Sequence, residues 1–176
     1  MEKGLSGGPT QDEVAAVALW HLRLRAGCTV ADVGCGTGKI AVAAARTAGR
    51  VIAVDRRPEA AACTKDTADA ALARNIEVFC GEAADVLRGA GPFDAAFVGG
   101  SRDLEAVLGV LADEVRGRIV VDCVLLGTLH RAVETMQRLG IFEEVVSLQV
   151  ARSRRLGSGL MMTPANPVWL VIGEAA

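Results

Sequence analysis

The sequence predicts an α/β fold in which a seven-stranded, mostly parallel sheet is covered by helices on both faces. Short apolar runs alternate with helical patterns along most of the 176 residues, as in parallel strands joined by crossover helices. The first of these strands passes directly into three closely spaced glycines, a turn that brings bare backbone close to a ligand. No helical pattern separates the last two strands, so they are expected to be antiparallel neighbours.

The first expected element is a helix that begins at a capping box. Thr10-Gln11-Asp12-Glu13 matches the pattern S/T-x-x-E, with Thr10 as the N-cap, and apolar residues at helical spacing continue toward Gly27. The later elements are expected, in order, as a strand at 30–33, a helix from Lys39 to Gly49, a strand at 51–54, a helix at 58–73, strands at 77–80 and 93–98, a helix around 104–111, a strand at 119–123, a helix around 129–140, and strands around 146–150 and 168–172. The intervening residues 151–167 show no helical periodicity.

Composition limits the classes of partner. The formal net charge is −2 and the pI about 5.7, so the chain has no basic field to attract a polyanion. Aromatic residues make up 3% of the chain and tyrosine is absent, which argues against a stacking platform for single-stranded nucleic acid. Nucleic acid is therefore not an expected partner.

The five cysteines are predicted to be reduced thiols packed as small apolar residues. They are odd in number, widely spread and never in a C-x-x-C pair, so neither disulfides nor a metal site is expected. No window approaches the length of a membrane span, and the first residues lack the apolar core of a signal peptide. We expect one cytoplasmic domain over residues 1–176. The cysteines are Cys28, Cys35, Cys63, Cys80 and Cys123.

The glycine turn departs from the two commonest phosphate-binding patterns. Gly34 and Gly36 match the first two glycines of the dinucleotide fingerprint G-x-G-x-x-G, but the third position is Lys39. The P-loop pattern also fails, because Gly38 and Lys39 are followed by Ile40 instead of Ser or Thr. The turn therefore predicts a ligand of another kind.

Two carboxylates flank this turn and indicate which ligand it serves. Asp55 ends the second strand, where a carboxylate can accept hydrogen bonds from two ribose hydroxyls. Asp32 lies two residues before Gly34, where it would be unfavourable beside a pyrophosphate but suits an ammonium or a sulfonium. S-adenosylmethionine carries both cations and a ribose. The alternative that stays open is a purely structural turn with two strand-end carboxylates.

These residues resemble the class I S-adenosylmethionine-dependent methyltransferases, which have a Rossmann-like fold, through DVGCGTG at 32–38 and VIAVD at 51–55. A narrower resemblance is to the cobalt-precorrin-6B carbon-15 methyltransferases (decarboxylating) of cobalamin synthesis, and it covers nearly the whole chain. The chain is also similar to the C-terminal half of a two-domain enzyme that methylates carbons 5 and 15. The blocks that carry the narrower resemblance are GGPTQDEV at 7–14, GEAADVL at 81–87, FDAAFVGGS at 93–101, GRIVVD at 117–122, and VARSRRLG with MMTPANPVWLV near the end.

The resemblance implies S-adenosylmethionine as methyl donor, a polycarboxylate tetrapyrrole as acceptor, and a homotetramer. Ser101 follows two glycines as in the family's Gly-Gly-Ser-Gly-Gly loop near the substrate, but Arg102 and Asp103 replace the last two glycines. Arg152, Arg154 and Arg155 form a basic cluster suited to carboxylates, with a solvated loop as the alternative. The expected cofactor-binding residues are Thr10, Asp32, Gly34, Cys35, Gly36, Thr37, Gly38, Asp55, Glu82 and Ala83.

The implied reaction moves a methyl group to a ring carbon, and an acetate side chain of the substrate leaves as CO₂. The nucleophile belongs to the substrate, so the protein is expected to align the reactants and exclude water, and no catalytic side chain is assigned. His21 and His130 are expected to be surface or packing residues. Two alternatives stay open: a methyltransferase for another small molecule, RNA or protein, and a non-catalytic cofactor-binding protein.

Overall fold

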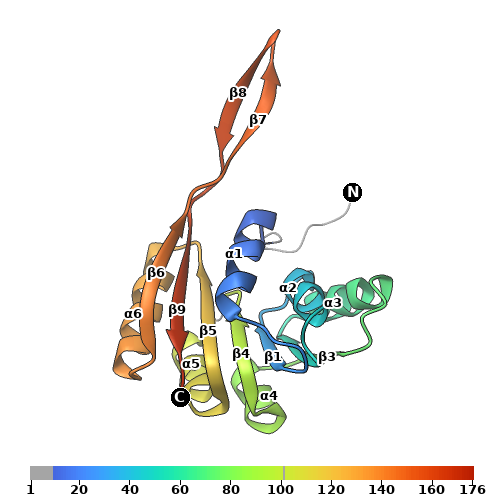
Figure 1. Cartoon of the computed structure of the whole chain (residues 1–176), viewed down its shortest axis with the longest axis vertical. Helices are drawn as coiled ribbons and strands as arrows, with labels where there is room; N and C mark the ends of the chain where they lie inside the picture. Colours follow the sequence, from blue (N-terminus) through green and yellow to red (C-terminus); the bar gives the residue numbers. More distant parts are fainter. Residues whose placement is uncertain (1–9, 101) are drawn as a thin grey trace.

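The computed structural model describes residues 10–100 and 102–176, and most of its strands form one seven-stranded sheet (Figure 1). The order of the strands across this sheet is β3-β2-β1-β4-β5-β9-β6, and β7 and β8 form a separate two-stranded hairpin. The strands are β1 (Thr29–Val33), β2 (Arg50–Asp55), β3 (Ile76–Cys80), β4 (Phe93–Val98), β5 (Val115–Cys123), β6 (Phe142–Leu148), β7 (Ala151–Leu156), β8 (Gly159–Pro164) and β9 (Val168–Glu174).

The direction of the strands confirms the predicted sheet. β1 pairs parallel with β2 and β4, β2 with β3, and β4 with β5. β9 is antiparallel to both of its neighbours, β5 and β6, because the chain returns from β6 without a crossover helix. All the other strands of the sheet therefore have their carboxyl ends at one edge, which we call the carboxyl edge.

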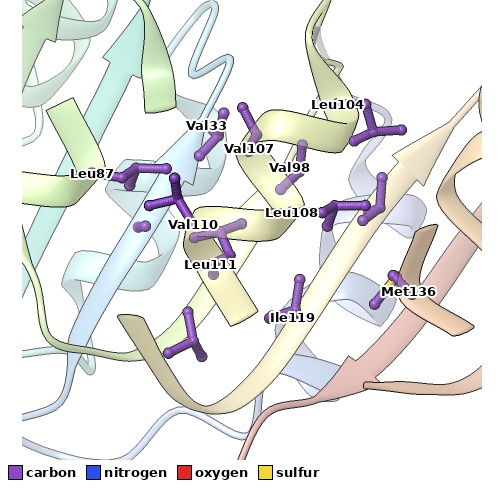
Figure 2. Packing of buried hydrophobic residues seen from close by; sticks show 14 of the residues in the cluster. Val33, Leu87, Val98, Leu104, Val107, Leu108, Val110, Leu111, Ile119 and Met136 are labelled. Carbon is purple, nitrogen blue, oxygen red and sulfur yellow. The ribbon is translucent and has the colours of Figure 1, made fainter. Parts of the chain in front are cut away.

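Helices cover both faces of the sheet, as predicted. Leu87, Leu108 and Met136 come from α4, α5 and α6 and pack in one core with inward residues of β1, β4 and β5 (Figure 2). On the opposite face α1 and α2 bury their apolar sides, and α3 packs beside α2. The helices are α1 (Asp12–Leu22), α2 (Lys39–Ala45), α3 (Pro58–Ala70), α4 (Ala83–Ala90), α5 (Leu104–Glu114) and α6 (Leu126–Arg138).

The capping box predicted at Thr10 is wrong. The N-cap of α1 is Gln11, and no side chain caps the helix. A capping box needs Glu13 to turn back onto the first backbone N–H groups, but the Glu13 carboxylate instead accepts a hydrogen bond from Arg152. The helix also ends earlier than predicted, at Leu22, because Arg23 adopts a left-handed conformation with φ of 49°.

Other differences concern the lengths and the number of elements. α2 ends at Ala45, four residues before Gly49, and α4, which is only eight residues long, was not predicted. The β7–β8 hairpin was not predicted either. All six residues of β7 are exposed, so its sequence carries no alternation of apolar and polar residues.

Candidate functional site

The candidate site lies at the carboxyl edge, between β1 and β4. The chain moves outward from β1 through β2 to β3, and outward in the opposite direction from β4 to β5, so the loops after β1 and β4 diverge. The backbone N–H of Gly99 donates to the Val33 carbonyl oxygen at 2.8 Å and ties the two strand ends together. In open α/β sheets this change of direction is where ligands bind.

The glycine turn after β1 is packed so closely that it admits no side chains at two positions. A Cβ on Gly34, whose φ is 73°, would lie 2.6 Å from the Gly100 carbonyl oxygen. A Cβ on Gly38, whose φ is 78°, would lie 3.0 Å from the Thr64 Cα. Both values are below ordinary van der Waals contact, so these glycines let β1, β4 and α3 approach one another around bare backbone.

Hydrogen bonds to β2 and α3 hold the glycine turn in place. The Gly34 and Cys35 N–H groups both donate to the Val54 carbonyl oxygen, at 2.8 and 3.1 Å. The Thr64 hydroxyl donates to the Gly36 carbonyl oxygen at 3.0 Å and lies 3.2 Å from the Cys35 sulfur. Burial raises the pKa of the Cys35 thiol to about 12, so this thiol is neutral and packs as an apolar group.

Asp55 closes the turn from the end of β2. Its Oδ2 accepts a hydrogen bond from the Gly36 N–H at 3.2 Å and one from the Arg57 guanidinium at 3.1 Å. Its Oδ1 accepts from the Arg57 backbone N–H at 3.0 Å and from Arg57 Nε at 3.1 Å. Burial raises the pKa of this carboxyl, but these hydrogen bonds outweigh burial and hold the pKa below its usual range. Asp55 is therefore an anion at neutral pH.

Asp32 differs from Asp55 in both burial and charge. It is 1% exposed on β1, and it accepts a backbone hydrogen bond from Ala41 of α2, while its Oδ2 has no hydrogen-bond partner within residues 10–100 and 102–176. Burial raises the pKa of the Asp32 carboxyl to about 7, and the negative charge of Asp55 adds to this rise. The carboxyl is therefore poised to lose its proton when a cation approaches.

A cavity of about 900 Å³ opens over the carboxyl edge, within the size range of small-molecule sites. The structure brings four of the predicted site residues into its lining: Gly34, Asp55, Glu82 and Ala83. Asp32 lies under the turn and outside this lining, as do the predicted residues Thr10, Cys35, Gly36, Thr37 and Gly38. Ser101 lies outside the described residues.

Several cavity residues were not predicted from the sequence. Arg56, Arg88 and Arg102 line the cavity from the loops or helices after β2, β3 and β4, and Leu125 lines it from the loop after β5. Arg88 forms an ion pair with Asp85 at 3.0 Å. A usable signal existed in the sequence, because each of these residues follows the end of a strand whose carboxyl end lies at this edge.

The predicted basic cluster lies elsewhere, on β7. Arg152 hydrogen-bonds to Glu13 of α1, and Arg154 Nε donates to the Thr163 hydroxyl at 3.0 Å across the hairpin. Arg155 is exposed on the same strand. None of the three lines the cavity, so the hairpin holds them outside it. The hairpin rises from the carboxyl edge of the sheet (Figure 1).

Lys39 links the start of α1 to the glycine turn. Its Nζ donates to the Thr10 carbonyl oxygen at 2.5 Å and lies 2.6 Å from the Asp12 carboxylate. Since Lys39 is the first residue of α2, directly after Gly38, these contacts hold Thr10 near the turn. Thr10 is thus held near the glycine turn through its backbone, although it neither caps α1 nor lines the cavity.

The remaining candidate groups give no second site within the described part of the chain. No cluster of three or more His, Cys, Asp or Glu residues there could hold a metal ion. His21 packs edge-on against Trp20, with ring centroids 4.7 Å apart, and His130 lies 3.2 Å from Glu134 on the surface of α6. Among residues 10–100 and 102–176, no helix is long and apolar enough to cross a membrane.

One family model matches nearly the whole chain. The model is described as a precorrin methyltransferase domain, and it matches residues 6–173. This chain belongs to the precorrin methyltransferase family. The curated relatives of this family member include a probable cobalt-precorrin-6B C(15)-methyltransferase (decarboxylating) of Methanosarcina acetivorans, which is 41% identical over 97% of this chain and 95% of the relative. The protein of the same name from Sulfolobus acidocaldarius is 34% identical over 94% and 89% of the two chains.

Solved structures of precorrin enzymes have the same fold as this precorrin methyltransferase family member. A precorrin 8W decarboxylase of Methanobacterium thermoautotrophicum superimposes with a TM-score of 0.91 at 34% identity, covering 96% of this chain and 92% of that one. A precorrin-6y C5,15-methyltransferase of Geobacter metallireducens gives 0.90 at 29% identity, covering 100% and 92%. An O-methyltransferase of Thermotoga maritima, at 15% identity and a TM-score of 0.76, shares the Rossmann-like fold alone. The expected methyltransferase class is therefore confirmed.

Proposed function

We propose that this chain methylates carbon 15 of cobalt-precorrin-6B, or of its cobalt-free analogue, and releases an acetate side chain of the substrate as CO₂. The observation that carries the proposal is the cavity at the carboxyl edge, where Gly34, Asp55, Glu82 and Ala83 form one wall. The printed names of relatives that match nearly the whole chain support the choice of substrate.

S-adenosylmethionine is the proposed methyl donor, and it supplies a methyl group on a positively charged sulfur. Three features of the site suit this molecule. Asp55 is an anion at the end of β2, where a ribose would lie, and Gly34 leaves bare backbone at the turn. Asp32 has a buried Oδ2 with no partner among the described residues, which suits a nearby ammonium or sulfonium. The rest of the proposed donor site is Thr10, Cys35, Gly36, Thr37, Gly38, Glu82 and Ala83.

The opposite wall of the cavity is proposed to hold the acceptor. Gly99, Gly100, Ala106, Val107 and Leu125 line this wall, giving backbone and apolar surface for a flat macrocycle. Arginine side chains on the same cavity can pair with the substrate's carboxylates.

Of these arginines, Arg102 lies on the acceptor wall, and Arg56 and Arg88 lie on the donor side. Ser101, Arg152, Arg154 and Arg155 stay as proposed substrate contacts. The three hairpin arginines would meet carboxylates outside the cavity of their own chain.

The protein's contribution to methyl transfer is proposed to be alignment and exclusion of water. The electron-rich ring carbon of the substrate is the nucleophile, so no nucleophilic side chain is required. Holding the two reactants at the strand ends converts a bimolecular encounter into a reaction within one complex, which can remove about 7–11 kcal/mol of the barrier.

The decisive experiment is incubation with isotopically labelled S-adenosylmethionine and cobalt-precorrin-6B, with the cobalt-free substrate in parallel, followed by mass spectrometry. A product that has gained one labelled methyl group and lost one CO₂ supports the proposal. Methyl transfer to neither substrate, with tight S-adenosylmethionine binding, would instead favour a non-catalytic binding protein. Asp55→Ala serves as the control, because it should abolish turnover by weakening the donor site.

We also infer a cytoplasmic homotetramer whose subunits each fold as one domain over residues 1–176. The exposed β7–β8 hairpin supports this inference, since an isolated two-stranded hairpin is barely stable in water and gains stability by packing against another chain. Light scattering measures the number of subunits, and a single cooperative unfolding transition tests the single domain. Fractionation of expressing cells tests the compartment.

A further inference from the structure

Three consecutive apolar residues are exposed where β5 passes into α6. Val124, Leu125 and Leu126 are 53%, 69% and 68% exposed, and we call these three residues the apolar ridge. Scattered apolar residues are normal on a protein surface, but a run of three is unfavourable in water unless it serves a function. Among the described residues, the other large exposed apolar side chains are either isolated along the chain or lie on the β7–β8 hairpin.

The local structure does not explain why leucine stands at position 125. Leu125 is the N-cap of α6, and its side chain makes no capping hydrogen bond. Serine, threonine, aspartate and asparagine are preferred at an N-cap because their side chains accept a hydrogen bond from the first N–H groups of the helix. A residue that contradicts such a local preference is expected where a function requires it.

The apolar ridge continues the acceptor wall of the cavity. Leu125 lines the cavity together with Ala106 and Val107 of α5, and Val124 and Leu126 flank Leu125 along the chain. The order of strands is β4, β5, β9, so at the carboxyl edge the ridge lies between the loop after β4 and the start of β9. The ridge therefore extends the apolar wall beyond the cavity, toward the hairpin.

Two arginines that line the cavity are available to a ligand. Arg56 and Arg102 form no ion pair with any other described residue, whereas the guanidinium of Arg57 is bound to Asp55. An apolar wall that has guanidinium groups nearby is complementary to a flat ring with carboxylates at its edge. The face of the ring would cover the leucines, and its carboxylates would reach the arginines.

We propose that the apolar ridge binds one face of the acceptor macrocycle, and that Leu125 is the residue that positions the ring against the cavity. This inference rests on the proposed decarboxylating methylation of a precorrin. It extends the acceptor site outside the cavity, to Val124 and Leu126. It also makes the ridge a specificity determinant, because a smaller acceptor would leave these side chains in water.

The ridge should act on binding and not on the chemical step. The face of the ring would contact Leu125 equally before and during methyl transfer, and contacts that do not change in the transition state lower KM without raising kcat. The inference therefore predicts a change in the KM for the precorrin alone.

The test compares Leu125→Ser and Leu125→Met with Leu72→Ser, which changes an equally exposed leucine outside the cavity. Leu125→Ser should raise the KM for the precorrin about 5- to 30-fold, because most of the Leu125 side chain would no longer gain from being covered. The kcat should stay within about twofold of the parent value. Leu125→Met keeps an apolar side chain of similar volume and should change KM less than about twofold. Leu72→Ser should not change KM.

Two further readouts separate contact with the substrate from structural damage. Serine caps a helix better than leucine does, so Leu125→Ser should raise the melting temperature by about 2–4 °C while it weakens substrate binding. The affinity for S-adenosylhomocysteine should stay unchanged. The KM for the precorrin should depend on salt as in the parent protein, because the ridge carries no charge.

An unchanged KM in Leu125→Ser would overturn the inference. A rise in KM accompanied by an equal loss of S-adenosylhomocysteine affinity or by a lower melting temperature would also overturn it, because Leu125 would then be structural. A smaller number of subunits in light scattering of Leu125→Ser would show that a second copy of this chain covers the ridge, which contradicts the inference as well.

The proposed function can fail separately from this inference. If the parent protein converts neither precorrin, the proposed function fails, and the ridge is then tested with uroporphyrin, a flat tetrapyrrole with carboxylates around its ring. Titration followed by visible absorbance should show about 5- to 30-fold weaker binding to Leu125→Ser than to the parent protein. Equal affinities, or no binding to the parent protein, would overturn the inference itself.

Discussion

Gly34 lies so close to Gly100 that a Cβ on Gly34 would stand 2.6 Å from the Gly100 carbonyl oxygen. This contact joins the turn after β1 to the loop after β4, and both glycines line the cavity. Neither residue can gain a side chain without cost, because both have positive φ values, of 73° and 98°.

Gly34→Ala should therefore separate the two loops and weaken S-adenosylhomocysteine binding at least tenfold, with a loss of about 1–3 kcal/mol in the free energy of unfolding. Isothermal titration calorimetry and urea unfolding measure the two effects. Gly109→Ala is the matched control. Gly109 is in α5 with open space around its Cβ position, so alanine there should stabilise the protein by about 0.5–1 kcal/mol. Unchanged ligand affinity in Gly34→Ala would contradict this account of the turn.

Asp32→Asn should change stability in a pH-dependent manner. The folded-state pKa of Asp32, about 7, lies above the unfolded value, so ionising Asp32 destabilises the folded state progressively as the pH rises from about 4 to 7. Asparagine cannot ionise, so the variant should melt at a higher temperature than the parent protein at pH 8 and at a similar temperature at pH 4. Its affinity for S-adenosylmethionine should fall. Calorimetric melting at the two pH values checks the sign, and a melting difference of equal size at both would refute it.

Arg118 should be a stability residue without a role in catalysis. It is 7% exposed near the start of β5, far from the carboxyl edge, and it pairs with Glu143 of β6 and, at 3.2 Å, with Glu174 of β9. Arg118→Ala should cost about 1–3 kcal/mol of unfolding free energy, less than for a fully buried pair because both carboxylates are partly exposed. Urea unfolding measures the cost, and ligand affinity should stay constant. Arg138→Ala, which breaks an exposed pair with Glu105, should cost less than half as much.

Arg102→Ala should raise the KM for the precorrin about fivefold, which corresponds to the loss of one exposed charge pair worth about 1 kcal/mol. Arg102 lines the cavity, on the wall proposed for the acceptor, so the KM for S-adenosylmethionine should not change. Steady-state kinetics with each substrate varied in turn separates the two constants. Arg74→Ala, in an exposed pair with Asp69 outside the cavity, provides the comparison. A larger effect on the methyl donor than on the acceptor would show that Arg102 is on the wrong wall.

Serine at both Leu160 and Met162 should reduce the number of subunits measured by light scattering. These residues are 73% and 60% exposed on one face of the hairpin, where nothing in the described chain covers them. Leu72→Ser removes an equally exposed leucine at the end of α3 and should leave the mass unchanged. A double variant with the parent mass would place the subunit contact away from this face.

The bounds of a helix or strand were predicted well where its buried residues form a regular apolar pattern in the sequence. β4 was predicted to its exact bounds because its apolar run is closed by two glycines, and the start of α2 at Lys39 follows directly from the glycine turn. The hairpin was missed because all six residues of β7 are exposed, so burial leaves no pattern in that strand. α4 is amphipathic, but it is only eight residues long, and so short a segment was not recognised as a helix.

The candidate site was predicted in part for a related reason. Gly34 and Asp55 are close to the cavity because they sit at strand ends, and strand ends can be located from apolar runs. The positions of the cavity arginines depend on which loop turns inward and on strand order across the sheet. Arg102 and Leu125 line one cavity only because β5 is the neighbour of β4, which no local pattern encodes.

The ion pair between Arg57 and Asp55 makes ligand entry an exchange of partners. A ribose that binds Asp55 must replace hydrogen bonds from the Arg57 guanidinium. The free energy needed to release Arg57 therefore lowers the net affinity for the nucleoside. Salt weakens the ion pair that competes with the ligand, so the association rate of an uncharged nucleoside should increase with ionic strength over the range in which the fold is unaffected. The exchange of hydrogen bonds at Asp55 would then contribute to discrimination among nucleosides, in addition to the contacts inside the cavity.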